Sequence, residues 1–172
     1  TVAHYDFSDC PPLDLILLPG GFGTVAQLGN GALLDFLRKR ANSALLDFLR
    51  KRSASAEVTM SVCSGSALLA KAGLLDGRRA TSNKMWFQLA RAQGERVAWG
   101  TAARWGEDGP FATSSGVSAG TDMALAVIAK LYGKPRAERV AIETEYTWHR
   151  DADRDPFAQY LDRAAAPKSQ ES

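Results

Sequence analysis

The chain has 172 residues, of which 45% are hydrophobic and 23% are charged, and its formal net charge is +2. This length suits one domain with its own core, and the composition excludes a disordered or low-complexity chain. No apolar run reaches the ~18 residues of a membrane span, and residues 1–10 lack the basic-then-apolar pattern of a signal peptide. A dedicated nucleic-acid-binding domain is usually far more basic. We therefore expect a soluble, cytoplasmic protein with neither membrane nor nucleic-acid partners.

Cysteine and histidine are rare in the chain, which contains only Cys10, Cys63, His4 and His149. Two cysteines are too few for a disulfide framework, and these four residues do not have the spacing of zinc ligands. We therefore expect no structural metal.

The first predicted element is a buried strand at residues 14–18, a short apolar run that Pro19-Gly20-Gly21 closes with a turn. An internal repeat follows. The nine residues Ala32–Arg40 return unchanged at Ala44–Arg52. Each copy has three basic residues and one acidic residue, a net of +2, so one copy accounts for the net charge of the chain. The leucines of each copy have helical spacing, which predicts an amphipathic helix.

A single straight helix cannot point both leucine stripes at one core. The offset between the copies is 12 residues, about 3.3 turns, which rotates the second stripe by ~120° from the first. Either the helix breaks near Asn42-Ser43, where one of these residues would cap a second helix, or one copy projects outward with its leucines exposed. An exposed copy would lie harmlessly on the surface or make a contact between chains. The sequence does not decide which copy packs on the sheet.

Strands and helices alternate along the rest of the chain. Residues 57–62 are rich in β-branched side chains and predict a strand, and the pattern becomes helical from Cys63 to Lys71, ending at Gly73. Beyond this point we predict strands at 78–81 and 96–99, a helix at 83–93, a hairpin at 105–113 that turns at Asp108-Gly109, a helix at 118–132 capped by Ser118, and a helix at 135–148 that begins with Pro135. We expect the charged tail after His149 to be loose. The alternation predicts an α/β fold with a mainly parallel sheet.

Cys63 is the main candidate for chemistry. It lies where a buried strand turns directly into a helix, at the carboxyl end of the sheet, where open α/β folds usually place their active sites. The small residues around it give Ser61–Gly65 the form of a nucleophile elbow. Backbone N–H groups at the helix start favour the thiolate, which is the reactive form, and a backbone N–H of Gly20-Gly21 could form an oxyanion hole with the N–H of Ser64. The alternative is a buried cysteine that acts as a small apolar residue.

Three segments, residues 14–23, 61–83 and 113–123, resemble the PfpI superfamily. These class I glutamine amidotransferase-like domains include intracellular proteases, deglycase-like proteins and isonitrile (isocyanide) hydratases, and the resemblance extends from about Leu13 to Ala158. The Val-Cys-Ser-Gly and Gly-Val-Ser-Ala-Gly stretches are most similar to the isonitrile-hydratase-like branch. The resemblance implies a flavodoxin-like three-layer sandwich in one domain over residues 1–160, with a polar tail at 161–172, and a homodimer.

The elbow and the resemblance together predict a cysteine-dependent hydratase that converts small isocyanides to N-substituted formamides without a cofactor. The predicted catalytic residues are Cys63, Ser64 and Gly21, and the predicted substrate-binding residues are Gly20, Asn83, Gly116 and Ser118. The alternative function is a non-catalytic ligand- or redox-sensing domain, because the same fold occurs as the front half of certain transcription regulators. Such a sensor would act through oxidation of an exposed thiolate or through ligand binding alone.

The sequence departs from the pattern of the superfamily in three ways. A strand, a helix and a further strand normally precede the Pro-Gly-Gly segment and supply an acidic residue to the cysteine, and the present chain begins after them. Asn83 stands where amidotransferases and several proteases place a histidine, which argues against a Cys–His dyad and against proteolysis. The duplicated helix lies between the site segments. Asp122 is a further candidate for proton transfer, although an acid in the first turn of a helix also complements the helix dipole.

Overall fold

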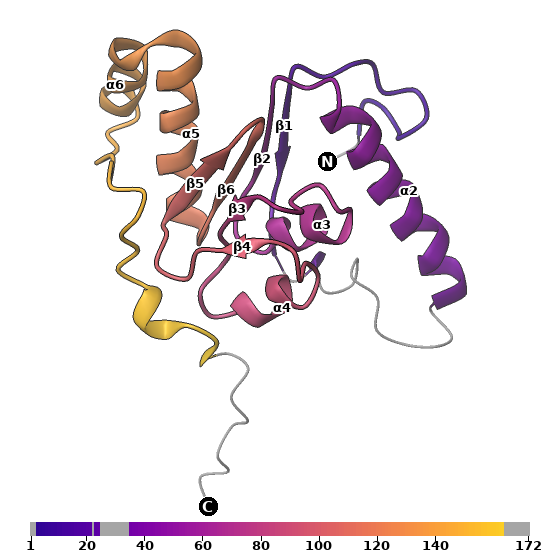
Figure 1. The fold of residues 1–172 in the computed structure, drawn as a ribbon. Helices are drawn as coiled ribbons and strands as arrows, with labels where there is room; N and C mark the ends of the chain where they lie inside the picture. Colours follow the sequence, from indigo (N-terminus) through magenta and orange to yellow (C-terminus); the bar gives the residue numbers. More distant parts are fainter. Residues whose placement is uncertain (1–2, 22, 25–34, 164–172) are drawn as a thin grey trace, which may run out of the picture.

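Four short strands form the central sheet of the molecule. In the computed structural model, which describes residues 3–21, 23–24 and 35–163, they lie in the order β1 (Leu15–Leu18), β2 (Val58–Ser61), β6 (Phe111–Ser114) and β5 (Trp105–Asp108) (Figure 1). The first three strands run parallel, and β5 pairs antiparallel with β6. A second sheet pairs β3 (Arg79–Ala80) in parallel with β4 (Ala98–Trp99). The prediction of a mainly parallel α/β fold is confirmed.

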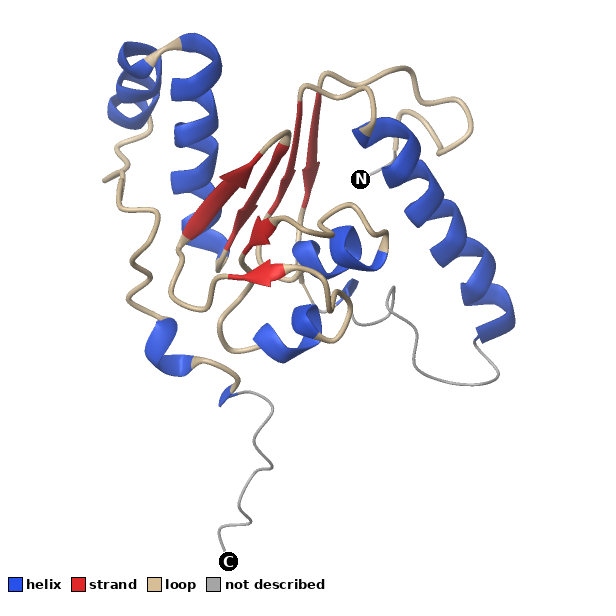
Figure 2. Cartoon of the chain, in the orientation of Figure 1, coloured by secondary structure: helices blue, strands red, loops and turns tan. Residues whose placement is uncertain are grey.

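Helices lie on both sides of the sheet (Figure 2). On one side are α2 (Asp35–Ser53), α3 (Gly65–Lys71) and α4 (Phe87–Arg91), and on the other are α5 (Val117–Tyr132) and α6 (Lys134–Glu143). A short 3-10 helix, η1 (Ala158–Tyr160), follows near the end of the described chain. None of the helices in the described residues is long and apolar enough to span a bilayer.

The alternation of side chains along β6 separates two hydrophobic cores. Phe111 packs with Leu49 of α2 and Leu68 of α3 in one core. The next residue, Ala112, points to the opposite face and packs with Met123 of α5 in the other. This division follows from the two-residue period of a strand, and it explains why strands covered on both faces are apolar or small throughout.

Residues 35–53, which hold most of the duplicated segment, form one continuous helix, α2, so of the two alternatives the break and cap at Asn42-Ser43 is wrong. No Gly or Pro interrupts residues 35–53, and an Asn or a Ser costs a helix interior only some tenths of a kcal/mol. The second copy packs on the core: Leu46 and Leu49 are buried, at 8% and 1% exposure, and Leu45 and Phe48 pack against the same cluster. Of the first copy, residues 32–34 lie outside the described residues, and residues 35–40 continue the helical backbone.

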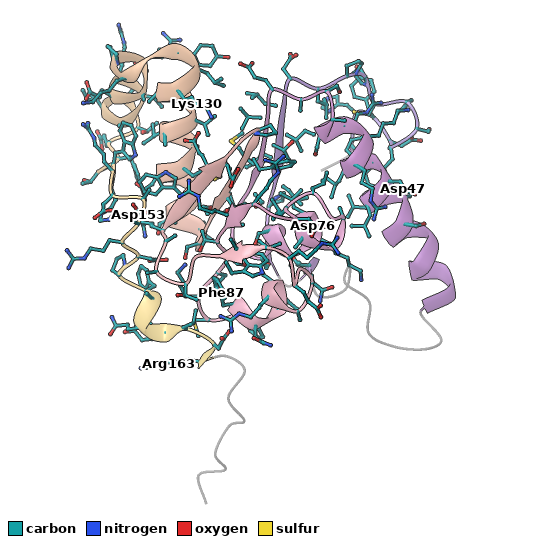
Figure 3. All side chains as sticks on the ribbon, in the orientation of Figure 1. Asp47, Asp76, Phe87, Lys130, Asp153 and Arg163 are labelled. Atoms are coloured by element: carbon teal, nitrogen blue, oxygen red, sulfur yellow. The ribbon has the colours of Figure 1, made fainter. Side chains whose placement is uncertain are left out.

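The outer face of α2 carries charged side chains. Asp47 and Arg50 are both exposed and form an ion pair of 2.7 Å (Asp47 is labelled in Figure 3). The Arg50 Nε also donates a hydrogen bond to the Ala72 carbonyl at 3.0 Å, which ties α2 to the end of α3. An exposed ion pair of this kind adds little to stability, so the buried leucines hold α2 in place.

Most of the other predicted elements lie where the pattern places them, with differences at their ends. The hairpin turns at Gly109 with a φ of +61°, and α3 is followed by Gly73 at +77°. Gly116, rather than Ser118, is the N-cap of α5. The last predicted helix ends earlier than expected, at Glu143, because Glu145 has a φ of +52° and the Tyr146 N–H donates back to Ala141, which closes the helix as a Schellman turn does.

The segment after His149 is held against the domain, so the prediction of a loose tail is wrong for residues 149–163. The Asp155 N–H donates to the Ala102 carbonyl and the Asp162 N–H donates to the Lys84 carbonyl, each at 2.8 Å. Asp155 itself is buried. Residues 164–172 lie outside the described residues, and a domain boundary near residue 160 stays a prediction.

We expect Leu49→Ala to lower the free energy of unfolding by about 2–5 kcal/mol, because it removes a buried side chain from the core between α2 and α3. Lys51 is exposed on the same turn of the helix, so Lys51→Ala is the matched control and should change stability by about 0.5 kcal/mol or less. Urea denaturation measures both. Equal losses in the two variants would show that the second copy does not anchor α2.

Candidate active site

Cys63 occupies the sharp turn between β2 and α3. Its φ is +60°, a left-handed conformation that it shares with only two other non-glycine residues in the described part of the chain, Glu145 and Asp162. For any residue other than glycine, this backbone conformation is unfavourable by about 1 kcal/mol or more. Contacts with the surrounding structure must therefore maintain it. The thiol is free and the residue is half-buried. The geometry is therefore that of the elbow expected from the sequence.

The loop that follows β1 presses directly against this turn. A Cβ atom built on Gly20 would lie 2.7 Å from the Cβ of Cys63 and 2.7 Å from the nitrogen of Ser64. A Cβ on Gly65 would lie 2.5 Å from the Leu18 carbonyl oxygen. Only glycine fits at either position. The structure thus gives Gly20 a packing role beside the cysteine, and its predicted contact with substrate stays a prediction.

The Ser64 hydroxyl joins the two predicted catalytic segments. The Gly21 N–H donates to Ser64 Oγ at 3.1 Å, and this hydroxyl donates in turn to Thr24 Oγ1 at 3.0 Å. The backbone N–H of Ser64 makes no hydrogen bond within the described residues. In this arrangement the Gly21 N–H is occupied, whereas the N–H of the buried Ser64, beside Gly20, has no acceptor among the described residues. The oxyanion role of both groups stays a prediction.

Hydroxyl groups from neighbouring elements hold the backbone of the elbow. Ser66 and Ser82 both donate to the Cys63 carbonyl, at 3.3 and 3.1 Å. Ser114, at the end of β6, donates to the Ser61 carbonyl at 3.4 Å. The loop after β3 and the carboxyl end of β6 are therefore in direct contact with the turn that carries the cysteine.

A pocket of about 220 Å³ opens next to these two contacts. We call it the Arg104 pocket; it is lined by Asn83, Lys84, Met85, Arg104, Ser115, Gly116, Ser118, Phe157 and Tyr160. Asn83 directly follows Ser82 and Ser115 directly follows Ser114, so two lining residues are chain neighbours of residues that bond the elbow, although Cys63 itself does not line the pocket. The structure brings together three of the four predicted substrate-binding residues here, and leaves Gly20 outside.

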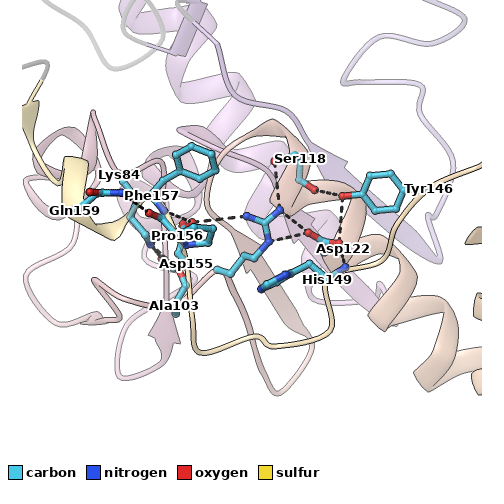
Figure 4. Close-up of polar contacts among 12 residues, drawn as sticks. Lys84, Ala103, Ser118, Asp122, Tyr146, His149, Asp155, Pro156, Phe157 and Gln159 are labelled. Atoms are coloured by element: carbon cyan, nitrogen blue, oxygen red, sulfur yellow. Dashed lines mark hydrogen bonds and ion pairs between the residues drawn. The ribbon is translucent and has the colours of Figure 1, made fainter.

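Two of the lining residues, Lys84 and Arg104, belong to a buried network of ion pairs (Figure 4). Arg104 Nε donates to Asp122 Oδ2 at 2.8 Å, and Nη2 forms an ion pair with the same oxygen at 2.6 Å. Asp155 lies between two cations, with one carboxylate oxygen 3.7 Å from Arg104 Nη1 and the other 3.7 Å from Lys84 Nζ. None of these four side chains is more than 7% exposed. The sequence gives little sign of the network, because it joins residues far apart in the chain.

Asp122 is fully buried and engaged on two sides. Beside its ion pair with Arg104, its Oδ1 accepts hydrogen bonds from the Tyr146 hydroxyl at 3.2 Å and from the His149 backbone N–H at 2.8 Å. Burial and the Asp122 carboxylate raise the pKa of Tyr146. These contacts give Asp122 a structural role and do not support its predicted part in proton transfer. The sequence did offer one signal for this ion pair. Asp122 lies among the apolar residues of α5, and a buried acid in such a place needs a cationic partner.

Lys84 is the largest fully buried side chain in the described residues. Its ammonium group donates to Thr81 Oγ1 at 2.8 Å and to the Ala103 carbonyl at 2.6 Å. Burial lowers the pKa of Lys84 to about 8, and the nearby Asp155 carboxylate opposes this shift. The lysine is therefore close to losing its charge at mildly alkaline pH.

The fold and the site together define a class of protein: an α/β domain with a strained, half-buried free cysteine at the carboxyl end of a mainly parallel sheet. Among the described residues there is no group of three or more His, Cys, Asp or Glu side chains placed to hold a metal ion. The sequence profile of the DJ-1/PfpI family matches residues 2–130. The chain belongs to the DJ-1/PfpI family, and its architecture is the flavodoxin-like one of that family.

Individual relatives have different activities. Isonitrile hydratase of Pseudomonas putida is 37% identical over 140 residues, 81% of this chain and 55% of that protein. The HTH-type transcriptional regulator CdhR of Pseudomonas aeruginosa is 36% identical over 129 residues, 74% of this chain and 34% of the regulator. The chain thus spans about half of the first relative and a third of the second. A crystal structure of a ThiJ/PfpI family protein from Pseudomonas syringae superimposes with a TM-score of 0.63 at 33% identity, covering 87% of this chain and 54% of that one.

We expect Gly20→Ala to lower the free energy of unfolding by about 1–3 kcal/mol, because the new methyl group would overlap the Cys63 side chain. Gly23→Ala is the matched control, since a Cβ there meets nothing within 4 Å. The two variants are compared by urea denaturation and by the rate at which iodoacetamide alkylates Cys63, measured by mass spectrometry. Similar behaviour of both variants would contradict the close contact.

The stability of the protein should rise with pH above about 8 because of Lys84. The folded protein releases this proton near pH 8 and the unfolded chain near 10.5, so between these values the unfolded state binds more protons and becomes less favourable as the pH rises. The free energy of unfolding of the native protein, relative to that of Lys84→Met, should therefore rise by up to ~1.4 kcal/mol per pH unit. This slope is the limit for the release of one proton. Urea denaturation of both proteins between about pH 8 and 9.5 measures this difference. Both proteins contain Tyr146, so the effect of its titration cancels in the comparison. A constant difference would contradict the lowered pKa.

Proposed function

We propose that this chain is a cysteine-dependent hydratase that converts small isocyanides to N-substituted formamides. The observation that carries the proposal is the backbone of Cys63, whose φ of +60° holds a free thiol at the turn between β2 and α3. The 37% identity to an isonitrile hydratase, over most of this chain, indicates the reaction. The chain covers only 55% of that relative, so the activity of the whole relative is part of the proposal.

The reaction divides into two steps. The Cys63 thiolate attacks the terminal carbon of the isocyanide and that carbon takes up a proton, so that a carbon–sulfur bond forms and the triple bond between nitrogen and carbon becomes a double bond. Water then adds to the carbon of this thioimidate and a proton moves to nitrogen. As the carbon–sulfur bond breaks, the hydroxyl group loses its proton, which replaces the one taken up in the first step, and the formamide and the thiolate are released. One isocyanide and one water become one formamide, and the covalent route replaces a difficult hydration by two easier steps.

The backbone N–H of Ser64 supports the first step, because it makes no hydrogen bond within the described residues and follows directly on the cysteine. A fixed donor at this place stabilises negative charge that develops on the reacting atoms. No hydrogen bond or ion pair in the described part of the chain joins the Cys63 sulfur to an acidic side chain. The proposal therefore assigns proton delivery to no residue.

We expect Cys63→Ser to reduce the hydration of benzyl isocyanide by about a thousandfold or more, because the serine hydroxyl has no adjacent base to activate it. Cys10→Ser removes the other cysteine and should leave the rate unchanged. Formation of the formamide is followed by proton NMR. Unchanged hydration by Cys63→Ser would eliminate the cysteine mechanism, and no hydration by the native chain would eliminate the proposed reaction.

The 36% identity to a transcription regulator favours a second candidate, a non-catalytic ligand- or redox-sensing domain. In the redox form, the Cys63 thiolate would reduce hydrogen peroxide to water and become a sulfenic acid. Mass spectrometry after peroxide treatment separates the two candidates. Oxidation of Cys63 by one oxygen atom in a chain that hydrates no isocyanide favours the sensor.

A further inference from the structure

The Arg104 pocket has an apolar mouth and a charged floor. Met85, Phe157 and Tyr160 line it and are 48%, 53% and 38% exposed, so they form the rim that faces solvent. Lys84 and Arg104 line it as well and are only 2% and 6% exposed. A ligand with an apolar body and a charged end matches this gradient, because the body would cover the exposed rim.

The two cations of the buried network reach the wall of the pocket, and its two carboxylates do not. Lys84 and Arg104 are lining residues, whereas Asp122 and Asp155 have no exposed side-chain surface and lie behind them. Coulomb energy falls with distance, so a charge in the pocket interacts more strongly with the cations in front than with the acids behind. The pocket therefore favours an anion although the four charges sum to zero.

Arg104 keeps one of its nitrogens available for such an anion. Its Nε and Nη2 are used by Asp122 and by the Ser118 hydroxyl, at 2.6 to 3.3 Å. Nη1 makes no hydrogen bond to any described residue, and its ion-pair partner Asp155 is 3.7 Å away, beyond hydrogen-bond distance. One N–H of this nitrogen can donate a charge-assisted hydrogen bond to a carboxylate oxygen.

Two further donors face the same pocket. No side chain caps the start of α5, and its first backbone hydrogen bond runs from Gly120 to Gly116, so the preceding N–H groups have no acceptor within the helix. Asn83 accepts a hydrogen bond from the Trp86 N–H through Oδ1, which leaves its Nδ2 as a donor. That nitrogen lies 4.0 Å from where a Cβ on Gly116 would be, so the amide and the start of the helix face each other.

We propose that the Arg104 pocket binds the carboxylate of a small organic acid with an apolar body. The carboxylate is held by Arg104 Nη1, Asn83 Nδ2 and the first N–H groups of α5, and the body lies against Met85, Phe157 and Tyr160. Asn83 of the pocket follows Ser82, whose hydroxyl bonds the Cys63 carbonyl, so this inference rests on the proposed function and extends it: the substrate of Cys63 is an isocyanide whose N-substituent carries a carboxylate.

The test uses N-formylphenylalanine, which is the hydration product of such an isocyanide and does not react with the thiol. Isothermal titration calorimetry with the native chain compares the acid with its methyl ester, which has the same body and no charge. We expect the acid to bind about tenfold more tightly, as one charge-assisted hydrogen bond would give. Equal affinity for acid and ester would overturn the inference.

Variants locate the carboxylate. Asn83→Asp places a negative charge in the pocket and should weaken binding of the acid by about tenfold, with little change for the ester. Gln88→Glu adds the same charge on an exposed position of α4 outside the pocket, and should leave the preference for the acid intact. If Gln88→Glu weakens binding of the acid as much as Asn83→Asp does, the attraction is a general effect of charge and the pocket is not the binding site.

The binding experiment is independent of catalysis. Preference for the acid in a chain that hydrates no isocyanide supports the carboxylate pocket and removes the proposed reaction. Hydration of benzyl isocyanide together with equal binding of acid and ester supports the reaction and removes the pocket. Hydration of isocyanoacetate faster than of its methyl ester supports both.

Discussion

The contact between Gly20 and the turn at Cys63 determines where the sulfur lies. Because position 20 has no side chain, the loop that follows β1 reaches within van der Waals distance of the Cys63 Cβ and the Ser64 nitrogen. The same approach brings the Gly21 N–H to the Ser64 hydroxyl. Left-handed backbone at a cysteine is unfavourable by itself, so it persists only where packing on both sides leaves no alternative. The strain at the elbow is thus maintained by the adjoining strand.

Burial of four charges gives the other half of the site its shape. Removing one partner of a buried ion pair usually costs about 3–5 kcal/mol, although replacing the whole pair by apolar side chains is often harmless. The Lys84, Arg104, Asp122 and Asp155 network is therefore weak evidence for high stability and strong evidence for a specified position. The network fixes the segment after His149, which has little regular secondary structure, against the loop after β3.

The accuracy of the sequence predictions follows how local each interaction is. The apolar run before Pro19, the switch to helical pattern at Cys63 and the Asp108-Gly109 turn are local signals, and each was found where expected. The break at Asn42 was wrong because burial of the second leucine stripe decides the helix and propensity does not. The ion pairs of Asp155 were missed because nothing near it in the chain indicates a partner. The packing of Gly20 against Cys63 has no local signal either, since it depends on how the strands pair, and the substrate contact predicted for Gly20 stays a prediction.

The C-terminal segment connects the pocket with the elbow. Asp155 pairs with Lys84, which lies two residues after Ser82, and the Ser82 hydroxyl bonds the Cys63 carbonyl. Asp155 also pairs with Arg104, which lines the pocket. The ion pairs of Asp155 therefore fix the C-terminal segment and, at the same time, fix Lys84 near the elbow and Arg104 in the pocket. A ligand carboxylate at Arg104 Nη1 would add a third anion to this network and would compete with Asp155 for the same nitrogen, so occupation of the pocket and the position of the C-terminal segment depend on the same buried charges.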